Sequence, residues 1–284
     1  MASFDFIDAA VRGYELVFRY FVYLARVALP VLFMSVLCSL VQMTLLGDDS
    51  DSLHAGLIML PAFLVAGLYY AGLVRFALYR EPIHVWGMPA VMPEKVKEDK
   101  KDIPYVQGRL SRVQSLQAGA VLYTLVSLTG AFIVGMLGRY ADTQGGAAHE
   151  VKAVESSMDA APTLLGFLVV LPILAGMVWL IRVAVIYVPV AMGFDFLRYM
   201  RSMRGLMSSI SIMMMSLICF LPTVTLLMPV VMLVLHLFGP MPVLVPLVGV
   251  VLIQGVAIFI VSIWVAAMAY GINQVMREEG QKKA

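Results

Sequence analysis

Few strongly polar side chains lie within the long apolar stretches of this 284-residue sequence. Gln254 lies near the middle of one stretch, and Arg75 and Arg182 lie near the ends of two others. If these stretches cross a bilayer, such groups could line a polar cavity or bind an anionic lipid headgroup. The sequence favours simpler roles, in which Gln254 makes an interhelical hydrogen bond and both arginines extend to the membrane surface.

Three hydroxyl side chains repeat every seven residues along another apolar stretch, namely Ser209, Ser216 and Thr223. This spacing places them on one face of a helix, where they could form the polar wall of a pore. Serine and threonine in helices more often donate a hydrogen bond to a carbonyl of the preceding turn. The second interpretation is therefore favoured.

Recognisable catalytic and metal-binding patterns are missing from the sequence. All 18 aspartates and glutamates lie outside the apolar centres, whereas ion coupling and proton relay need ionisable groups at bilayer depth. The four histidines lack zinc-ligand spacing, and the sequence contains neither a phosphate-binding glycine loop nor a nucleophile motif. We therefore predict no catalytic residue, no cofactor and no bound metal, and hence a protein that is not an enzyme.

The amino-acid composition indicates whether the protein is soluble or lies in a membrane. Hydrophobic residues make up 61% of the chain and charged residues 13%, whereas soluble domains contain about 25% charged residues. The net charge of +2 argues against a nucleic-acid partner, and two cysteines exclude a disulfide framework. The composition predicts an integral membrane protein.

A transmembrane helix needs about 20 apolar residues to cross roughly 30 Å of hydrocarbon. Six stretches meet this requirement and predict an all-α bundle of six transmembrane helices. These spans are residues 27–46, 55–74, 117–137, 163–180 with an apolar extension to 192, 207–237 and 243–269.

Lysines and arginines are distributed unequally between alternate connections. Sixteen lie in the N-terminal segment, the second connection, the fourth connection and the tail, whereas two lie in the other connections. Because cytoplasmic segments carry the excess of positive charge, both termini are expected in the cytoplasm. A bacterial plasma (inner) membrane is the expected location.

Several segments are expected to lie outside the bilayer. Residues 1–26 are expected to form an interfacial amphipathic helix, and residues 193–206 a basic one. Residues 78–116 are expected to form a charged cytoplasmic loop with a further interfacial helix, residues 139–162 an external loop, and residues 273–284 a cytoplasmic tail. The basic segment contributes three candidate contacts to anionic lipid, in addition to Arg75, Arg182 and Gln254: Arg198, Arg201 and Arg204.

One part of the sequence resembles a known arrangement. The run from Trp179 to Pro189 contains Arg182 and is followed by a basic segment and a new apolar span. This order is similar to that in poorly characterised bacterial six-helix membrane proteins and in the membrane domain attached to some glycerophosphoryl diester phosphodiesterases. The resemblance implies a six-helix fold. The phosphodiesterase domain, with its metal-binding acids and histidines, is missing from this sequence, so no functional residue is carried over.

Two functions remain open at this point. The first is a non-enzymatic structural or accessory subunit of a larger membrane or envelope assembly, with membrane lipids around it and a protein partner bound through the loop 78–116. The alternative is a transporter or channel for a lipid or another hydrophobic, weakly polar substrate. Hydroxyls, Gln254 and interfacial arginines would suffice for that task.

Overall fold

A computed structural model describes residues 5–46, 52–85, 88–89, 110–151, 182–202, 206–238 and 244–281. These residues are almost all helical, and they also include short connections and a short antiparallel ladder between β1 (His84–Val85) and β2 (Met88–Pro89). The helices are α1 (Phe6–Arg19), α2 (Phe21–Leu46), α3 (Ser52–Tyr79), α5 (Arg112–Val151), α7 (Tyr187–Ala191), α8 (Phe196–Ser202), α9 (Leu206–Phe238) and α10 (Leu244–Gln281).

Five of these helices, α2, α3, α5, α9 and α10, are long and apolar enough to cross a membrane. They coincide with the expected first, second, third, fifth and sixth spans, which confirms an almost all-helical architecture with several helices of the length and composition of membrane spans. The expected fourth span, residues 163–180, lies outside the part of the chain that the structure describes. Six spans and their orientation therefore remain predictions.

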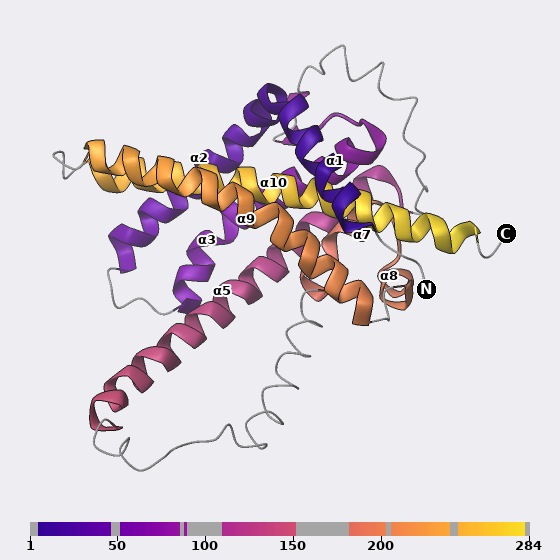
Figure 1. The fold of residues 1–284 in the computed structure, drawn as a ribbon. Helices are drawn as coiled ribbons and strands as arrows, with labels where there is room; N and C mark the ends of the chain where they lie inside the picture. The colour runs from indigo at the N-terminus through magenta and orange to yellow at the C-terminus, as the bar shows by residue number, and fades with distance from the viewer. Residues whose placement is uncertain are drawn as a thin grey trace.

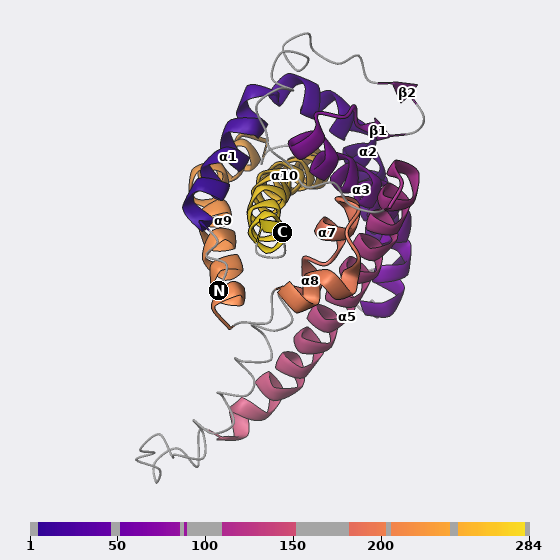
Figure 2. The ribbon, with the colours of Figure 1, turned by 90° about the vertical axis from the view of Figure 1, so that its right-hand side faces the viewer.

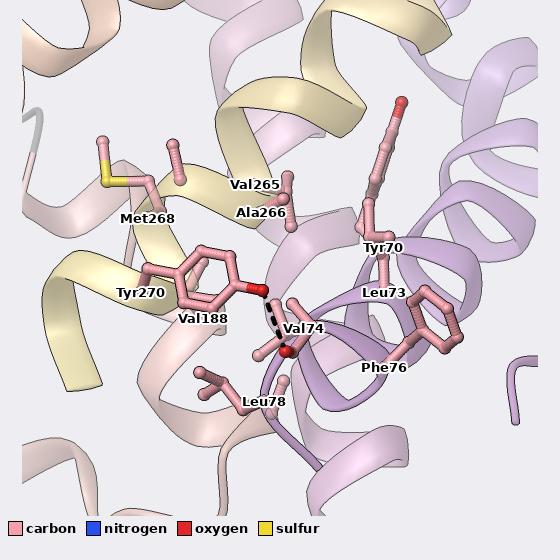
Figure 3. Packing of buried hydrophobic residues seen from close by; sticks show 14 of the residues in the cluster. Tyr70, Leu73, Val74, Phe76, Leu78, Val188, Val265, Ala266, Met268 and Tyr270 are labelled. Atoms are coloured by element: carbon pink, nitrogen blue, oxygen red, sulfur yellow. Dashed lines mark hydrogen bonds between the residues drawn. The ribbon is translucent and has the colours of Figure 1, made fainter. Parts of the chain in front are cut away.

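Helix α10 occupies the centre of the arrangement, with α1, α9, α2, α3 and α7 around it (Figure 2). Helices α9 and α10 lie side by side and run in opposite directions, whereas α5 extends away from the other helices (Figure 1). The buried core lies where α3, α7 and α10 meet. There, Tyr70, Leu73 and Phe76 of α3 belong to one buried hydrophobic cluster with Val265 of α10 and Val188 of α7 (Figure 3).

Helix α1 packs against α9 and α10 through a face of small residues. Asp5 caps its first turn, because one carboxylate oxygen accepts from the backbone N–H groups of Ile7 and Asp8 at 3.1 Å. A Cβ atom added at Gly13 would lie 2.8 Å from the Cβ atom of Ala267, so the two helices approach each other closely. The helix ends at Arg19, so the break lies before the expected junction at residue 26.

Two helices extend past the boundaries expected for their spans. Helix α5 begins at Arg112, inside the expected segment 78–116, and continues to Val151, inside the expected external loop 139–162. It contains no proline, and isolated glycines cost a helix only about 1 kcal/mol each. Helix α10 continues to Gln281, through most of the expected tail 273–284, because Ile272, Val275 and Met276 are buried at helical spacing.

Candidate functional site

Arg75 is buried in an ion pair and does not extend to the surface, in contrast to the role that the sequence favours. Its side chain lies near the end of α3, where Nε and Nη2 donate to the two carboxylate oxygens of Glu81, each at 2.8 Å. Nη1 donates to the Ser115 hydroxyl oxygen at 2.8 Å, and Arg112 Nε lies 3.2 Å from the same carboxylate. This cluster joins α3 to the start of α5.

A left-handed residue explains how Glu81 reaches Arg75. Arg80 has a φ of 52°, and it follows directly after the last residue of α3. A residue in this conformation ends a helix and turns the chain back over its last turn. The Arg80 guanidinium Nη1 donates to the carbonyl oxygen of Ala77 at 3.2 Å, which adds a further hydrogen bond at the helix end.

Arg182 is also buried, and its Nε donates to the Ser209 hydroxyl oxygen. Tyr199 of α8 packs beside it, and its hydroxyl donates to the Arg182 carbonyl oxygen at 3.4 Å. Burial raises the pKa of the Tyr199 phenol, and the neighbouring Arg182 charge lowers it in part. The position of Arg182 therefore connects the segment before α7 to α8 and α9.

Gln254 makes the interhelical hydrogen bond that the sequence favours. Its Nε2 donates to the Ser39 hydroxyl oxygen at 3.2 Å and so connects α10 to α2. A side-chain amide inside a bundle of spans needs such a partner.

The three repeated hydroxyls of α9 face neighbouring helices. Ser216 accepts from Trp264 Nε1 at 2.8 Å, and Thr223 lies 2.9 Å from the Tyr14 hydroxyl. Ser216 and Thr223 also donate to the carbonyl oxygens four residues before them, as predicted. The repeat therefore forms contacts of α9 with Arg182 through Ser209, with α10 through Ser216 and with α1 through Thr223.

The arginines of the basic segment are placed only in part. Arg198 of α8 is partly buried, with its Cζ atom 5.6 Å from the centroid of the Phe194 ring. Arg201 is exposed, and Arg204 lies outside the described residues. Contact of these side chains with anionic lipid remains a prediction.

An apolar cavity of about 430 Å³ is the feature that sequence reasoning missed. It lies between α2 and α10, with contributions from α1, α3 and α9. Among the described residues of its lining, hydroxyl groups occur only at Tyr69 and Ser262. Their oxygens lie 3.2 Å apart, and the Ser262 hydroxyl donates to the Ile258 carbonyl oxygen at 2.7 Å. No charged side chain belongs to the lining that the structure describes.

The cavity opens onto the apolar exterior of the helices. Leu29 and Val251 belong to its lining and are 59% and 38% exposed. Gly255 also belongs to the lining, and a Cβ atom added there would meet no atom within 4 Å. The small residues Ala25, Ala28 and Gly255 are the only signal in the sequence, and small residues are equally typical of close helix packing.

The cavity and the polar contacts around it are suited to binding an apolar molecule more than to catalysing a reaction. Among the described residues, no group of three or more histidine, cysteine, aspartate or glutamate side chains could hold a metal ion. Cavities of about 300 to 1,000 Å³ are typical of sites for small molecules. Comparisons of the chain with protein-family models, with curated proteins and with solved structures find no match.

Proposed function

We propose that the protein is a non-enzymatic integral membrane protein that holds a lipid or another hydrophobic, weakly polar molecule between its helices and transports it. The apolar cavity between α2 and α10 carries this proposal, because its lining matches a hydrophobic molecule in size and chemistry. The partly buried Gln254 and the buried Arg182 support it less directly than expected, since each is hydrogen-bonded within the protein.

Mass spectrometry of the protein, extracted gently with its native lipid, tests this function. We expect one lipid or hydrophobic molecule to co-purify at a fixed ratio to the chain. Because Gln254 contacts Ser39, replacement of Gln254 by Leu should leave both this ratio and transport in reconstituted vesicles nearly unchanged. A protein that carries no specific molecule would contradict the proposal.

A structural or accessory subunit is the second candidate, and the contacts between the end of α3 and the start of α5 favour it. Arg112 Nη2 donates to the Pro82 carbonyl oxygen at 3.2 Å, and Arg112 also pairs with Glu81. These contacts hold the two ends of the connection between α3 and α5 side by side. A connection whose two ends are fixed in this way suits the binding of a partner protein.

Cross-linking tests the second candidate. We expect the lysines of this connection to cross-link to a stoichiometric partner protein, and Arg112→Gln to weaken these cross-links by freeing one end of the loop. Arg12→Gln is the matched control, because Arg12 is an exposed arginine paired within α1. A protein purified without any partner would contradict this function.

We also propose six spans in a bacterial inner membrane, with both termini in the cytoplasm. The positive charge of alternate connections supports this orientation. Reporter fusions test it. A fluorescent protein fused after residue 284 should fluoresce, and alkaline phosphatase fused near residue 152 should be active. The reverse pattern would overturn the orientation.

A further inference from the structure

We propose that the cavity between α2 and α10 is a site for one hydrocarbon chain of a membrane lipid, which enters sideways from the bilayer and leaves its headgroup outside. This inference rests on the proposed transport function and names the chemistry that the cavity recognises. It is carried by the lining, the length and the opening of the cavity.

The lining excludes a charged or strongly polar headgroup. The cavity wall includes apolar side chains such as Leu24, Leu32 and Val256, and its two hydroxyls bond to each other. Ser262 donates to its own helix, so the Tyr69 hydroxyl is left to donate to Ser262. The pair therefore has no free donor for a phosphate or carboxylate, and a headgroup placed there would lose its hydrogen bonds.

The length of the cavity matches one leaflet of a bilayer. Its lining extends from Phe21 to Leu32 on α2 and from Val251 to Ser262 on α10. Each stretch advances by about 16 Å, at roughly 1.5 Å per residue. Half of a hydrocarbon core about 30 Å thick is about 15 Å, which is the space that one extended chain occupies in its leaflet.

The opening of the cavity selects a molecule that is already in the bilayer. Leu29 and Val251 belong both to the lining and to the exposed apolar surface, so the cavity is continuous with the surface that faces lipid. At the end nearest α1, aromatic rings pack edge to face. The centroid of the Phe259 ring lies 6.0 Å from that of Phe21 and 5.8 Å from that of Phe18. A chain would therefore enter from the side.

Filling of empty volume is the reason for a chain to stay. Transfer of a chain from lipid to an apolar cavity gains no hydrophobic free energy, because both surroundings are apolar. An empty cavity, however, leaves its lining without dispersion contacts on one side. A chain that fits the cavity restores those contacts, so shape determines which chain binds.

Gly255 allows a direct test. A Phe at this position would project into open space of the cavity without meeting another atom at its Cβ. Gly130 of α5 is the matched control, because a Cβ atom there also meets nothing within 4 Å and Gly130 does not line the cavity. Gly255→Phe should fill the cavity, and Gly130→Phe should leave it open.

The probe is a phosphatidylcholine with a photoreactive diazirine near the end of one acyl chain, incorporated in vesicles with the full-length protein. We expect labelled peptides to concentrate on the cavity faces of α2 and α10. Gly255→Phe should reduce this labelling about tenfold or more, a change that corresponds to about 1.4 kcal/mol of binding free energy. Gly130→Phe should not reduce it.

Two results would overturn the inference: equal labelling of the exposed faces of α5 and α9, or labelling at the cavity that Gly255→Phe leaves unchanged. If Gly255→Phe does not fold, Ala28→Leu fills the cavity from the α2 side and tests the same point. A lipid that co-purifies with folded Gly255→Phe at the wild-type ratio would refute the chain site and leave the proposed transport intact. A wild-type protein without any bound molecule would refute both.

Discussion

Arg75 and Glu81 hold each other by two parallel hydrogen bonds, each 2.8 Å long. The Arg75 side chain is 10% exposed and the Glu81 side chain 24% exposed, so the pair is largely removed from water. Such a paired geometry orients both groups as well as stabilising them. The pair fixes the turn after α3 at the place where α5 begins.

Replacement of Glu81 by Gln is expected to destabilise the protein by about 3 kcal/mol, because the buried Arg75 charge would lose its counter-charge. Thermal unfolding of the purified protein in detergent measures the change. The double variant Arg75→Met with Glu81→Leu should recover most of the loss, since no buried charge remains. Equal losses in the single and double variants would contradict this explanation.

The exposed pair of Asp8 and Arg12 provides the comparison. Its side chains are 38% and 50% exposed, with Arg12 Nε 3.0 Å from the carboxylate. Arg12→Gln should therefore change stability by no more than about 0.5 kcal/mol. A loss similar to that of Glu81→Gln would show that charge number, and not burial, determines the effect.

Gly13 is expected to be intolerant of even one added carbon. A Cβ atom there would lie 2.8 Å from the backbone nitrogen of Ala267 and 2.9 Å from the Ile263 carbonyl oxygen, and backbone cannot yield easily. Gly13→Ala should therefore cost about 1 to 3 kcal/mol. Gly130→Ala, in open space on α5, should instead gain about 0.5 to 1 kcal/mol. Thermal unfolding measures the stability of both variants. If both are more stable than the wild type, the close approach of α1 to α10 is excluded.

The Tyr14 phenol predicts a change in stability at alkaline pH. Its hydroxyl donates to the Cys219 carbonyl oxygen at 2.9 Å, and burial raises its pKa above the ordinary value of 10. The folded state favours the neutral phenol. The contribution of Tyr14 to the free energy of unfolding is therefore complete below pH 10 and is lost as the pH rises through the folded-state pKa. Tyr14→Phe should cost about 1 kcal/mol near neutral pH.

A pH series of unfolding measurements on wild type and Tyr14→Phe tests the sign. Other tyrosines titrate in both proteins, so the informative quantity is the difference between their free energies of unfolding. This difference should decrease above pH 10. A difference that stays constant or increases would contradict burial as the cause of the raised pKa.

The sequence predicted the ends of the helices well where hydropathy changes sharply along the chain, and poorly where it does not change. The fifth expected span, residues 207–237, nearly coincides with α9 because charged residues and a Gly-Pro pair bound it. The break at Tyr20 follows Arg19, but arginines also occur elsewhere in the expected helix 1–26, at Arg12 and Arg26, so charge does not distinguish this position. Gln274 looks like part of a polar tail, yet its Nε2 donates to Asp8 at 3.0 Å, a contact between opposite ends of the chain.

The sequence predicted polar contacts within one helix and the presence of an interhelical hydrogen bond at Gln254, but it did not predict which residues of distant segments are the partners. The back-bonding of Ser216 and Thr223 follows from residue type alone. The Arg75 and Glu81 pair instead depends on the left-handed conformation of Arg80, which no glycine marks in the sequence. The cavity depends on how α2 and α10 meet, and composition does not determine that geometry.

The bond between Gln254 and Ser39 gives a final prediction, because it distinguishes a structural amide from one that contacts substrate. The two groups lie 3.2 Å apart on α10 and α2. Interhelical hydrogen bonds of this kind contribute about 0.6 kcal/mol in membranes, so Gln254→Leu and Ser39→Ala should each cost about that amount and should not add in the double variant. Unfolding measurements on the four proteins give the coupling energy. Losses that add fully would show that Gln254 acts through another partner, and a substrate would then become the first group to test.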